Sequence, residues 1–265
     1  MVSARTFILN KAKTLGHLAR VAGRLLYRDG ISCVFKKIAH WRQHRTAQPR
    51  IDAEFGTETL SWVQVEDLAA YGPNVSYASG YGPSPVFDAE YILKQLPMVF
   101  SENVFVDLGC GKGLVLMLAA QLGFKRVIGV EFGRNLYEVA LTNLKKFQQR
   151  NMDRPLIEVV FGDAAEFVFP AADLVLYLYH PFGPEVIGKV LDNLRISLSQ
   201  FPRSCWIVYV NPVHHRVFED CDFLVTYKAE VGRESGEPFA LYKHLPGEGF
   251  ADWRVMSGRS NVCRD

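Results

Sequence analysis

The sequence lacks the segments that direct a chain into or across a membrane. It contains no run of about 18 apolar residues, which is the length that a membrane-spanning helix needs. The first 30 residues also lack a compact apolar region followed by a small-residue cleavage site. We therefore expect a soluble, cytoplasmic protein.

Cysteines are few and are not arranged for disulfides or zinc. Their number is odd, and no two of them have the C-x-x-C spacing that is typical of structural zinc sites. The five are Cys33, Cys110, Cys205, Cys221 and Cys263. This pattern fits a reducing compartment and predicts no metal site.

Acidic residues are nearly absent from the first 50 positions. This stretch has 11 Lys or Arg against one acid, Asp29, whereas the rest of the chain has 19 basic and 27 acidic residues. Apolar residues recur in it at near-helical spacing: Ile8, Leu15, Leu18, Ala22, Leu25 and Leu26. We predict a basic helical extension over residues 1–50.

The sequence leaves the partner of this extension open. Its apolar stripe could pack on the body of the protein with the charges in water. It could also lie on an anionic membrane surface or grip a nucleic acid backbone. Arg-rich, acid-poor composition is also typical of an organelle transit peptide, although serine is sparse here.

The full sequence is 49% apolar, so the chain after residue 50 can form one large domain with a lead-in. Residues 51–100 form this lead-in: an irregular stretch rich in Gly and Pro, expected to carry ligand contacts, and a helix over 86–96. Strand and helix patterns then alternate. Strands are predicted at 103–108, 126–131, 156–161, 173–179 and 204–211, with helices at 113–123, 134–149 and 185–200. Such alternation predicts a parallel sheet that is covered on both faces.

Two β-rich runs, 223–231 and 238–244, break this alternation because no helix fits between them. They predict a hairpin at the end of the sheet. We assign residues 101–245 to the main domain and 246–265 to a C-terminal tail.

A glycine-rich loop follows the first strand of the alternating region. The strand ends in Asp107-Leu108, and three glycines follow at alternate positions: Gly109, Gly111 and Gly113. Glycines let a ligand approach bare backbone and tolerate positive φ. The next strand ends in Glu131, whose carboxylate could accept hydrogen bonds from a ribose diol. The pattern indicates a cofactor that carries a nucleoside.

The glycine spacing decides between cofactors. A dinucleotide fingerprint, G-x-G-x-x-G, needs its third glycine where this chain has Leu114. The spacing here, G-x-G-x-G after an acidic and a hydrophobic residue, resembles the class I S-adenosylmethionine (SAM) dependent methyltransferases, notably bacterial members of unassigned substrate. The resemblance covers about residues 100–245. It implies an α/β fold with a doubly wound, seven-stranded, mostly parallel sheet that has a C-terminal antiparallel strand.

The resemblance also implies which residues bind SAM. The glycine loop would wrap the amino-acid part, Glu131 the ribose hydroxyls and Asp163 the exocyclic amine of adenine, while Tyr81 belongs to an aromatic lid. The full predicted set is Asp107, Gly109, Gly111, Gly113, Glu131, Phe132, Asp163, Ala164 and Tyr81. Structural roles remain open: Glu131 as a charge at a helix N-terminus and Asp163 as an N-cap. Lys112 is expected to face solvent or to pair with an acid.

The predicted catalytic element is Tyr179-His180-Pro181-Phe182, after the fourth strand. It resembles a variant of the Asn/Asp-Pro-Pro-Tyr element of amino-group methyltransferases, but Tyr179 and His180 replace the first two residues. His180 can accept a proton near neutral pH, or it can be a loop histidine bonded to backbone. Tyr177 shares a strand face with Tyr179. Residues 211–215 follow the fifth strand and are expected to line the acceptor pocket.

We therefore predict a SAM-dependent methyltransferase with an unidentified acceptor. A protein amine, as in lysine methylation, is preferred over a nucleobase or a small molecule. One alternative is an NAD(P)-dependent oxidoreductase. Another is a non-catalytic nucleotide-binding scaffold whose basic arm docks on nucleic acid or an anionic membrane.

Overall fold

The computed structural model describes residues 52–69, 74–232, 236–244 and 246. These residues belong to one unit, Gln48–Asp265. The predicted helical extension over 1–50 and residues 247–265 of the predicted tail lie outside the described residues, so both stay predictions.

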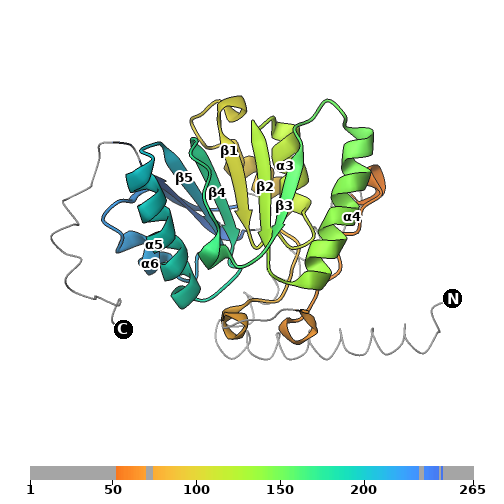
Figure 1. Cartoon of the computed structure of the whole chain (residues 1–265), viewed down its shortest axis with the longest axis horizontal. Helices are drawn as coiled ribbons and strands as arrows, with labels where there is room; N and C mark the ends of the chain where they lie inside the picture. Colours follow the sequence, from red (N-terminus) through yellow and green to blue (C-terminus); the bar gives the residue numbers. More distant parts are fainter. Residues whose placement is uncertain (1–51, 70–73, 233–235, 245, 247–265) are drawn as a thin grey trace. The chain divides into compact units, whose positions relative to one another are not determined.

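Seven strands form one sheet in the order β3-β2-β1-β4-β5-β7-β6 (Figure 1). The strands are β1 (Val104–Leu108), β2 (Arg126–Glu131), β3 (Ile157–Phe161), β4 (Leu174–Tyr179), β5 (Cys205–Val210), β6 (Val225–Val231) and β7 (Pro238–His244). The first five are parallel, whereas β7 runs antiparallel to both β5 and β6. The predicted fold, with its antiparallel C-terminal strand, is confirmed.

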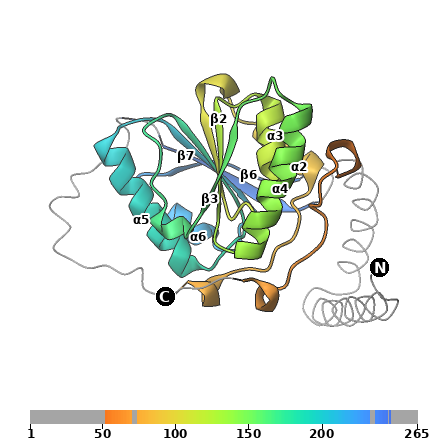
Figure 2. The same cartoon turned by 45° about the vertical axis from the view of Figure 1, so that its right-hand side comes forward.

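Helices cover both faces of this sheet (Figure 2). One face packs against α2 (Val86–Leu93), α3 (Leu114–Leu122) and α4 (Arg134–Arg150), and the other against α5 (Pro184–Gln200) and α6 (His215–Glu219). Side chains of β1 alternate between the two cores: Phe105 belongs to the first, and Val104, Val106 and Leu108 belong to the second. A strand buried on both sides in this way is almost wholly apolar, which is why the sequence pattern found it.

The ends of the helices follow local rules. Gly113 and Gly123 flank α3 with φ of 85° and 83°, a left-handed conformation that side chains disfavour. Pro184 opens α5, where its missing N–H costs no hydrogen bond. The predicted helix over 86–96 ends earlier, at Leu93, and turns lead to Pro97. The five-residue α6 was not predicted, because it is too short to show a period.

Among the described residues, none of the helices combines the length and the apolar character that crossing a membrane would require.

The strand order places the site. The chain proceeds from β1 to β2 on one side of the sheet, whereas β4 pairs with the other side of β1. Loops that leave the carboxyl ends of β1 and β4 therefore diverge and open a crevice. In open α/β sheets, ligands bind at this point.

Candidate active site

A cavity of about 360 Å³ lies at the carboxyl ends of the parallel strands. Its size falls in the range of small-molecule sites. Residues at the carboxyl ends of the strands line it: Asp107, Gly109, Cys110 and Gly111 at the end of β1, Glu131 and Phe132 at the end of β2, Gly162, Asp163 and Ala164 after β3, Tyr179, His180, Pro181 and Phe182 at the end of β4, and Asn211 after β5. Of the predicted site residues, only Gly113 is not in the lining.

The glycine loop packs tightly between its neighbours. Gly109 and Gly111 have φ of 83° and 54°. A Cβ on Gly109 would lie 2.6 Å from Cβ of Pro181, and one on Gly111 would lie 2.2 Å from the ring of Tyr81. Gly113 caps α3 instead of facing the cavity. Gly109 and Gly111 are therefore required by their close packing against Pro181 and Tyr81, and the approach of a ligand to this backbone stays a prediction.

Replacing Gly111 with Ala is expected to lower the free energy of unfolding by about 1–3 kcal/mol, because the new Cβ meets Tyr81 at a strained φ. Chemical denaturation measures this change. Gly162→Ala is the matched control: Gly162 also lines the cavity, but a Cβ added to it would meet nothing within 4 Å beyond its chain neighbours. Equal stability of the two variants would contradict the packing argument.

Two buried carboxyl groups lie together beside the loop. Burial raises the pKa of Asp107 well above its usual value, and the nearby charge of Glu131 raises it further. Burial also raises the pKa of Glu131 to about 7, although backbone N–H groups oppose the shift. Two carboxyl groups with raised pKa values in one cavity are typical of a functional site.

Glu131 joins the glycine loop to α4. Its Oε1 accepts a hydrogen bond from the Gly133 N–H at 2.7 Å, and its Oε2 accepts one from the Gly111 N–H at 2.8 Å. The alternative role of a charge at a helix N-terminus therefore describes part of its environment. Because each carboxylate oxygen has two lone pairs, capacity remains for two ribose hydroxyls.

Asp163 follows β3 at the far end of the cavity. Its Oδ1 accepts from the Ala165 N–H at 2.9 Å, so it caps the short helix η4 (Ala164–Glu166) as predicted. Its Oδ2 accepts from the Asn74 side chain at 2.6 Å. The adenine contact stays a prediction.

The lead-in supplies the outer wall of the cavity. Two of its segments, 58–69 and 74–82, are called the strap below. They contribute Trp62, Leu68, Asn74, Ala78, Ser79, Gly80, Tyr81 and Gly82 to the lining. The two segments of the strap pair with each other through Val63 and Tyr81, and with the predicted catalytic element through Ala78 and Phe182. The expectation that the lead-in reaches the ligand site agrees with this position.

Lys112 departs from one of the two expectations for it. It does not face solvent: its side chain is 3% exposed and pairs with Glu58 of the strap. The expectation of pairing with an acid is met, by a residue 54 positions away.

His180 sits in a strained turn directly after β4. Its φ is 38°, and that of Asn211 is 51°, and both residues line the cavity. Such conformations in residues other than glycine concentrate at functional sites. His180 Nδ1 lies 3.4 Å from the Tyr209 hydroxyl, and its ring lies 5.3 Å from that of His214. The partner of this ring nitrogen is thus a side chain and not the backbone of the alternative prediction.

The environment keeps His180 neutral. Partial burial lowers the pKa of its imidazole, and the nearby His214 lowers it further. A neutral imidazole can accept a proton at neutral pH.

The two tyrosines of β4 differ in depth. Tyr177 is fully buried, whereas Tyr179 is half-buried. Both line the cavity, and both side chains lie on one face of the strand. The prediction of a shared face, with at least one core tyrosine, is confirmed.

Sequence reasoning missed two carboxyl groups near Tyr179. Glu237 lines the cavity just before β7, and Asp88 is buried in α2. Burial raises the pKa of Tyr179, and the charges of Glu237 and Asp88 raise it further, which places both near its hydroxyl. Neither residue lies in a motif, so no local signal marks them.

Of the residues predicted after β5, Asn211 lines the cavity, whereas His215 lies 3.9 Å from Glu219 of α6. Within the described ranges, no group of three or more His, Cys, Asp or Glu side chains is placed to hold a metal ion.

Comparisons with known proteins converge on one kind of domain. A family model described as a methyltransferase domain matches residues 106–180. The chain is similar to the H3 lysine-79 specific histone-lysine N-methyltransferase of Dictyostelium discoideum, with 35% identity over 110 residues, 38% of this chain and 6% of that protein. It is also similar to the ribosomal protein L11 methyltransferase of Thermotoga maritima, with 31% identity over 74 residues, 28% of this chain and 27% of that protein. The chain thus spans a small part of either curated relative.

Among solved structures, the chain is similar to an RNA methyltransferase from Salinibacter ruber in complex with S-adenosyl-L-homocysteine. The sequence identity is 22% and the TM-score 0.44, over 65% of this chain and 97% of that one.

Proposed function

We propose that the chain is a class I SAM-dependent methyltransferase, which its match to a methyltransferase domain model supports, and that it transfers a methyl group from SAM to an amine of a protein substrate. Membership in this family was predicted from the glycine loop, and it was preferred over the oxidoreductase alternative. The proposal adds the chemical class of the methyl acceptor.

The residues of the cavity fit SAM. The glycine loop offers bare backbone, and Asp107 and Glu131 offer carboxylates to an amino group and to ribose hydroxyls. Tyr81 packs over Gly111 and can contact the cationic end of the cofactor through its ring. When bound, SAM supplies a methyl group on a positively charged sulfur. The protein must then position the acceptor and exclude water.

The observation that carries the proposal is that a base with a lowered pKa, His180, and a carboxylate, Glu237, line the same cavity. Glu237 would attract an ammonium group to the cavity. His180 would then take the proton that the ammonium must lose before it can act as a nucleophile. Since Nδ1 faces the Tyr209 hydroxyl, Nε2 is the atom assigned to this proton.

Two of the curated relatives support a protein acceptor. Their names describe methylation of a histone lysine and of ribosomal protein L11. From the sequence, a protein amine is preferred over a nucleobase. The test must therefore distinguish methylation of protein from methylation of nucleic acid.

Radiolabelled SAM tests the acceptor class. We expect label to enter poly-L-lysine, core histones or ribosomal protein L11, and to be recovered as an N-methyl amino acid after acid hydrolysis. Total RNA should take up none. Glu237→Gln should raise KM for the protein acceptor about fivefold without changing the Kd of S-adenosylhomocysteine (SAH), because it removes only the attraction for the ammonium.

Glu230→Gln is the control, since Glu230 lies on β6 of the same hairpin and outside the cavity lining. Label in RNA alone would contradict a protein amine as the acceptor. An unchanged KM in Glu237→Gln would contradict the role of its charge.

A further inference from the structure

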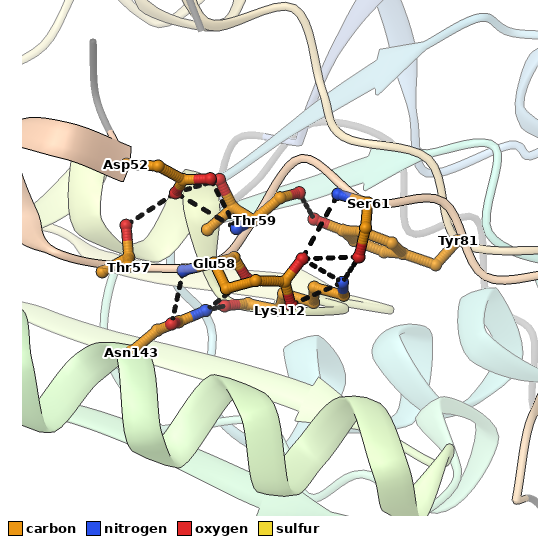
Figure 3. A network of polar contacts seen from close by, with 8 residues as sticks. All are labelled: Asp52, Thr57, Glu58, Thr59, Ser61, Tyr81, Lys112 and Asn143. Atoms are coloured by element: carbon orange, nitrogen blue, oxygen red, sulfur yellow. Dashed lines mark hydrogen bonds and ion pairs between the residues drawn. The ribbon is translucent and has the colours of Figure 1, made fainter. Parts of the chain in front are cut away.

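A buried lysine lies inside the glycine loop. Lys112 Nζ donates to both carboxylate oxygens of Glu58 at 2.8 Å, and also to the Ser61 hydroxyl (Figure 3). Its side chain is 3% exposed, whereas that of Glu58 is 52% exposed. Charged groups are almost never buried without a partner, so the burial of Lys112 depends on the strap staying in place.

Asn143 of α4 fixes the backbones of both partners. Its Nδ2 donates to the carbonyl of Glu58 at 2.9 Å and to that of Lys112 at 3.0 Å, and its Oδ1 accepts from the Glu58 N–H. Figure 3 shows this amide between the two segments. Asn143 thus fixes the position of the glycine loop relative to the strap.

Tyr81 extends the contact to the cavity. Its hydroxyl donates to the Thr59 carbonyl at 2.7 Å, and its ring lies against Gly111, with Lys112 Nζ 5.4 Å from the ring centroid. Trp62, next to Ser61 in the strap, also lines the cavity. Tyr81 and Trp62, which line the outer side of the cavity, are therefore connected to the glycine loop through the contacts of Lys112 with Glu58 and Ser61.

The pKa of Glu58 agrees with a formed ion pair. Partial burial raises this pKa, but hydrogen bonds from Lys112 and Ser61 outweigh burial and leave it below its usual value. The Glu58 carboxylate is therefore ionised at neutral pH.

We propose that Lys112 and Glu58 form a latch that holds the strap over the cofactor cavity and sets the rate at which SAM and SAH leave it. Lys112 is a positioning residue: it acts through the strap and is not assigned a contact with the reacting atoms. The inference rests on the cofactor of the proposed function and not on its acceptor.

The test measures binding kinetics of SAH on the full chain by surface plasmon resonance. In Lys112→Met and Glu58→Ala, the dissociation rate should rise about tenfold, with a smaller change in the association rate. The double variant should also release SAH about tenfold faster, and not a hundredfold, because both substitutions open one latch.

Hydrogen exchange gives a second readout without turnover. In the unaltered protein, SAH should slow amide exchange in residues 58–66, and both single variants should lose this protection. The control pair, Lys94→Met and Glu90→Gln, removes an exposed ion pair on α2 and should change neither measurement.

Several outcomes would overturn the latch. One is wild-type dissociation of SAH from both folded single variants, and another is multiplication of their effects in the double variant. If Lys112→Met fails to fold, Glu58→Ala decides alone, since it removes the more exposed partner. Failure of the unaltered protein to bind SAH would overturn the cofactor and the latch together, whereas normal binding with unchanged variant kinetics would overturn the latch alone.

Discussion

Replacing His180 with Asn is expected to lower kcat about 100-fold while the Kd of SAH stays unchanged. The loss is the usual contribution of a general base to proton transfer. Asn is the suitable substitute, because it tolerates the left-handed backbone that His180 adopts, with φ of 38°. Single-turnover kinetics with a saturating protein acceptor, together with calorimetric titration of SAH, separates the two effects.

The pH profile distinguishes a base from a structural residue. A general base is active when it is deprotonated, and burial lowers the pKa of His180. The acidic limb of kcat should therefore lie below pH 6.5, the usual pKa of histidine, and should disappear in His180→Asn. His215→Ala, an exposed histidine of α6, is the control. Normal turnover of His180→Asn would exclude the base and leave a positioning role for the loop.

The sequence predicted the sheet and the glycine loop because their signals are local. Buried parallel strands such as β1 are short apolar runs, and helices such as α4 show a period within a few turns. Positive φ at Gly109 and Gly111 follows from the same short motif. The carboxylate of Glu131 was found by its place at the end of a strand. These features need no knowledge of distant contacts.

The position of the strap was harder to predict, because it depends on contacts between residues that are distant in sequence. Glu58 meets Lys112 across 54 positions, and Asn74 meets Asp163 across 89. Glycine and proline in the lead-in indicate an irregular chain but not where it packs. The burial of Lys112 in particular contradicts the usual preference of lysine for the surface, so only its partner explains it.

The acceptor end was only partly predictable for a similar reason. Tyr179 ends β4 and His180 follows it, and both were found from that position. Glu237 enters from the β6–β7 hairpin and Asp88 from α2, so the sheet must be assembled before either carboxyl group comes near Tyr179. A functional site built from several elements has no single sequence motif.

Burial of Glu131 makes cofactor affinity depend on pH. Its pKa is raised to about 7, and only the ionised carboxylate can accept hydrogen bonds from both ribose hydroxyls. SAH affinity of the unaltered protein should therefore increase as the pH rises, by up to about tenfold per pH unit below 7, and level off above it. In the absence of ligand, stability has the opposite dependence. Since the folded protein holds a proton that the unfolded chain releases near pH 4.5, stability falls by roughly 3 kcal/mol between pH 4.5 and 7.

Replacing Glu131 with Gln should weaken SAH binding about 100-fold at pH 8, because two charge-assisted hydrogen bonds are lost. The variant should also lose the contribution of Glu131 to both pH dependences, so that its affinity and its stability vary less between pH 5 and 8, while the buried Asp107 still contributes to the pH dependence of stability. Calorimetric titration and thermal unfolding across this range measure the two effects, and Glu158→Gln, an exposed carboxylate on β3, is the control. Wild-type affinity in Glu131→Gln would exclude the ribose contact. Weak binding with an unchanged pH profile of the affinity would instead assign the titration to Asp107, because burial and the charge of Glu131 raise the pKa of that group. Opposite pH dependences of affinity and stability, both reduced by one substitution, would show that this carboxyl group is kept in the core for its ligand at a cost to the fold.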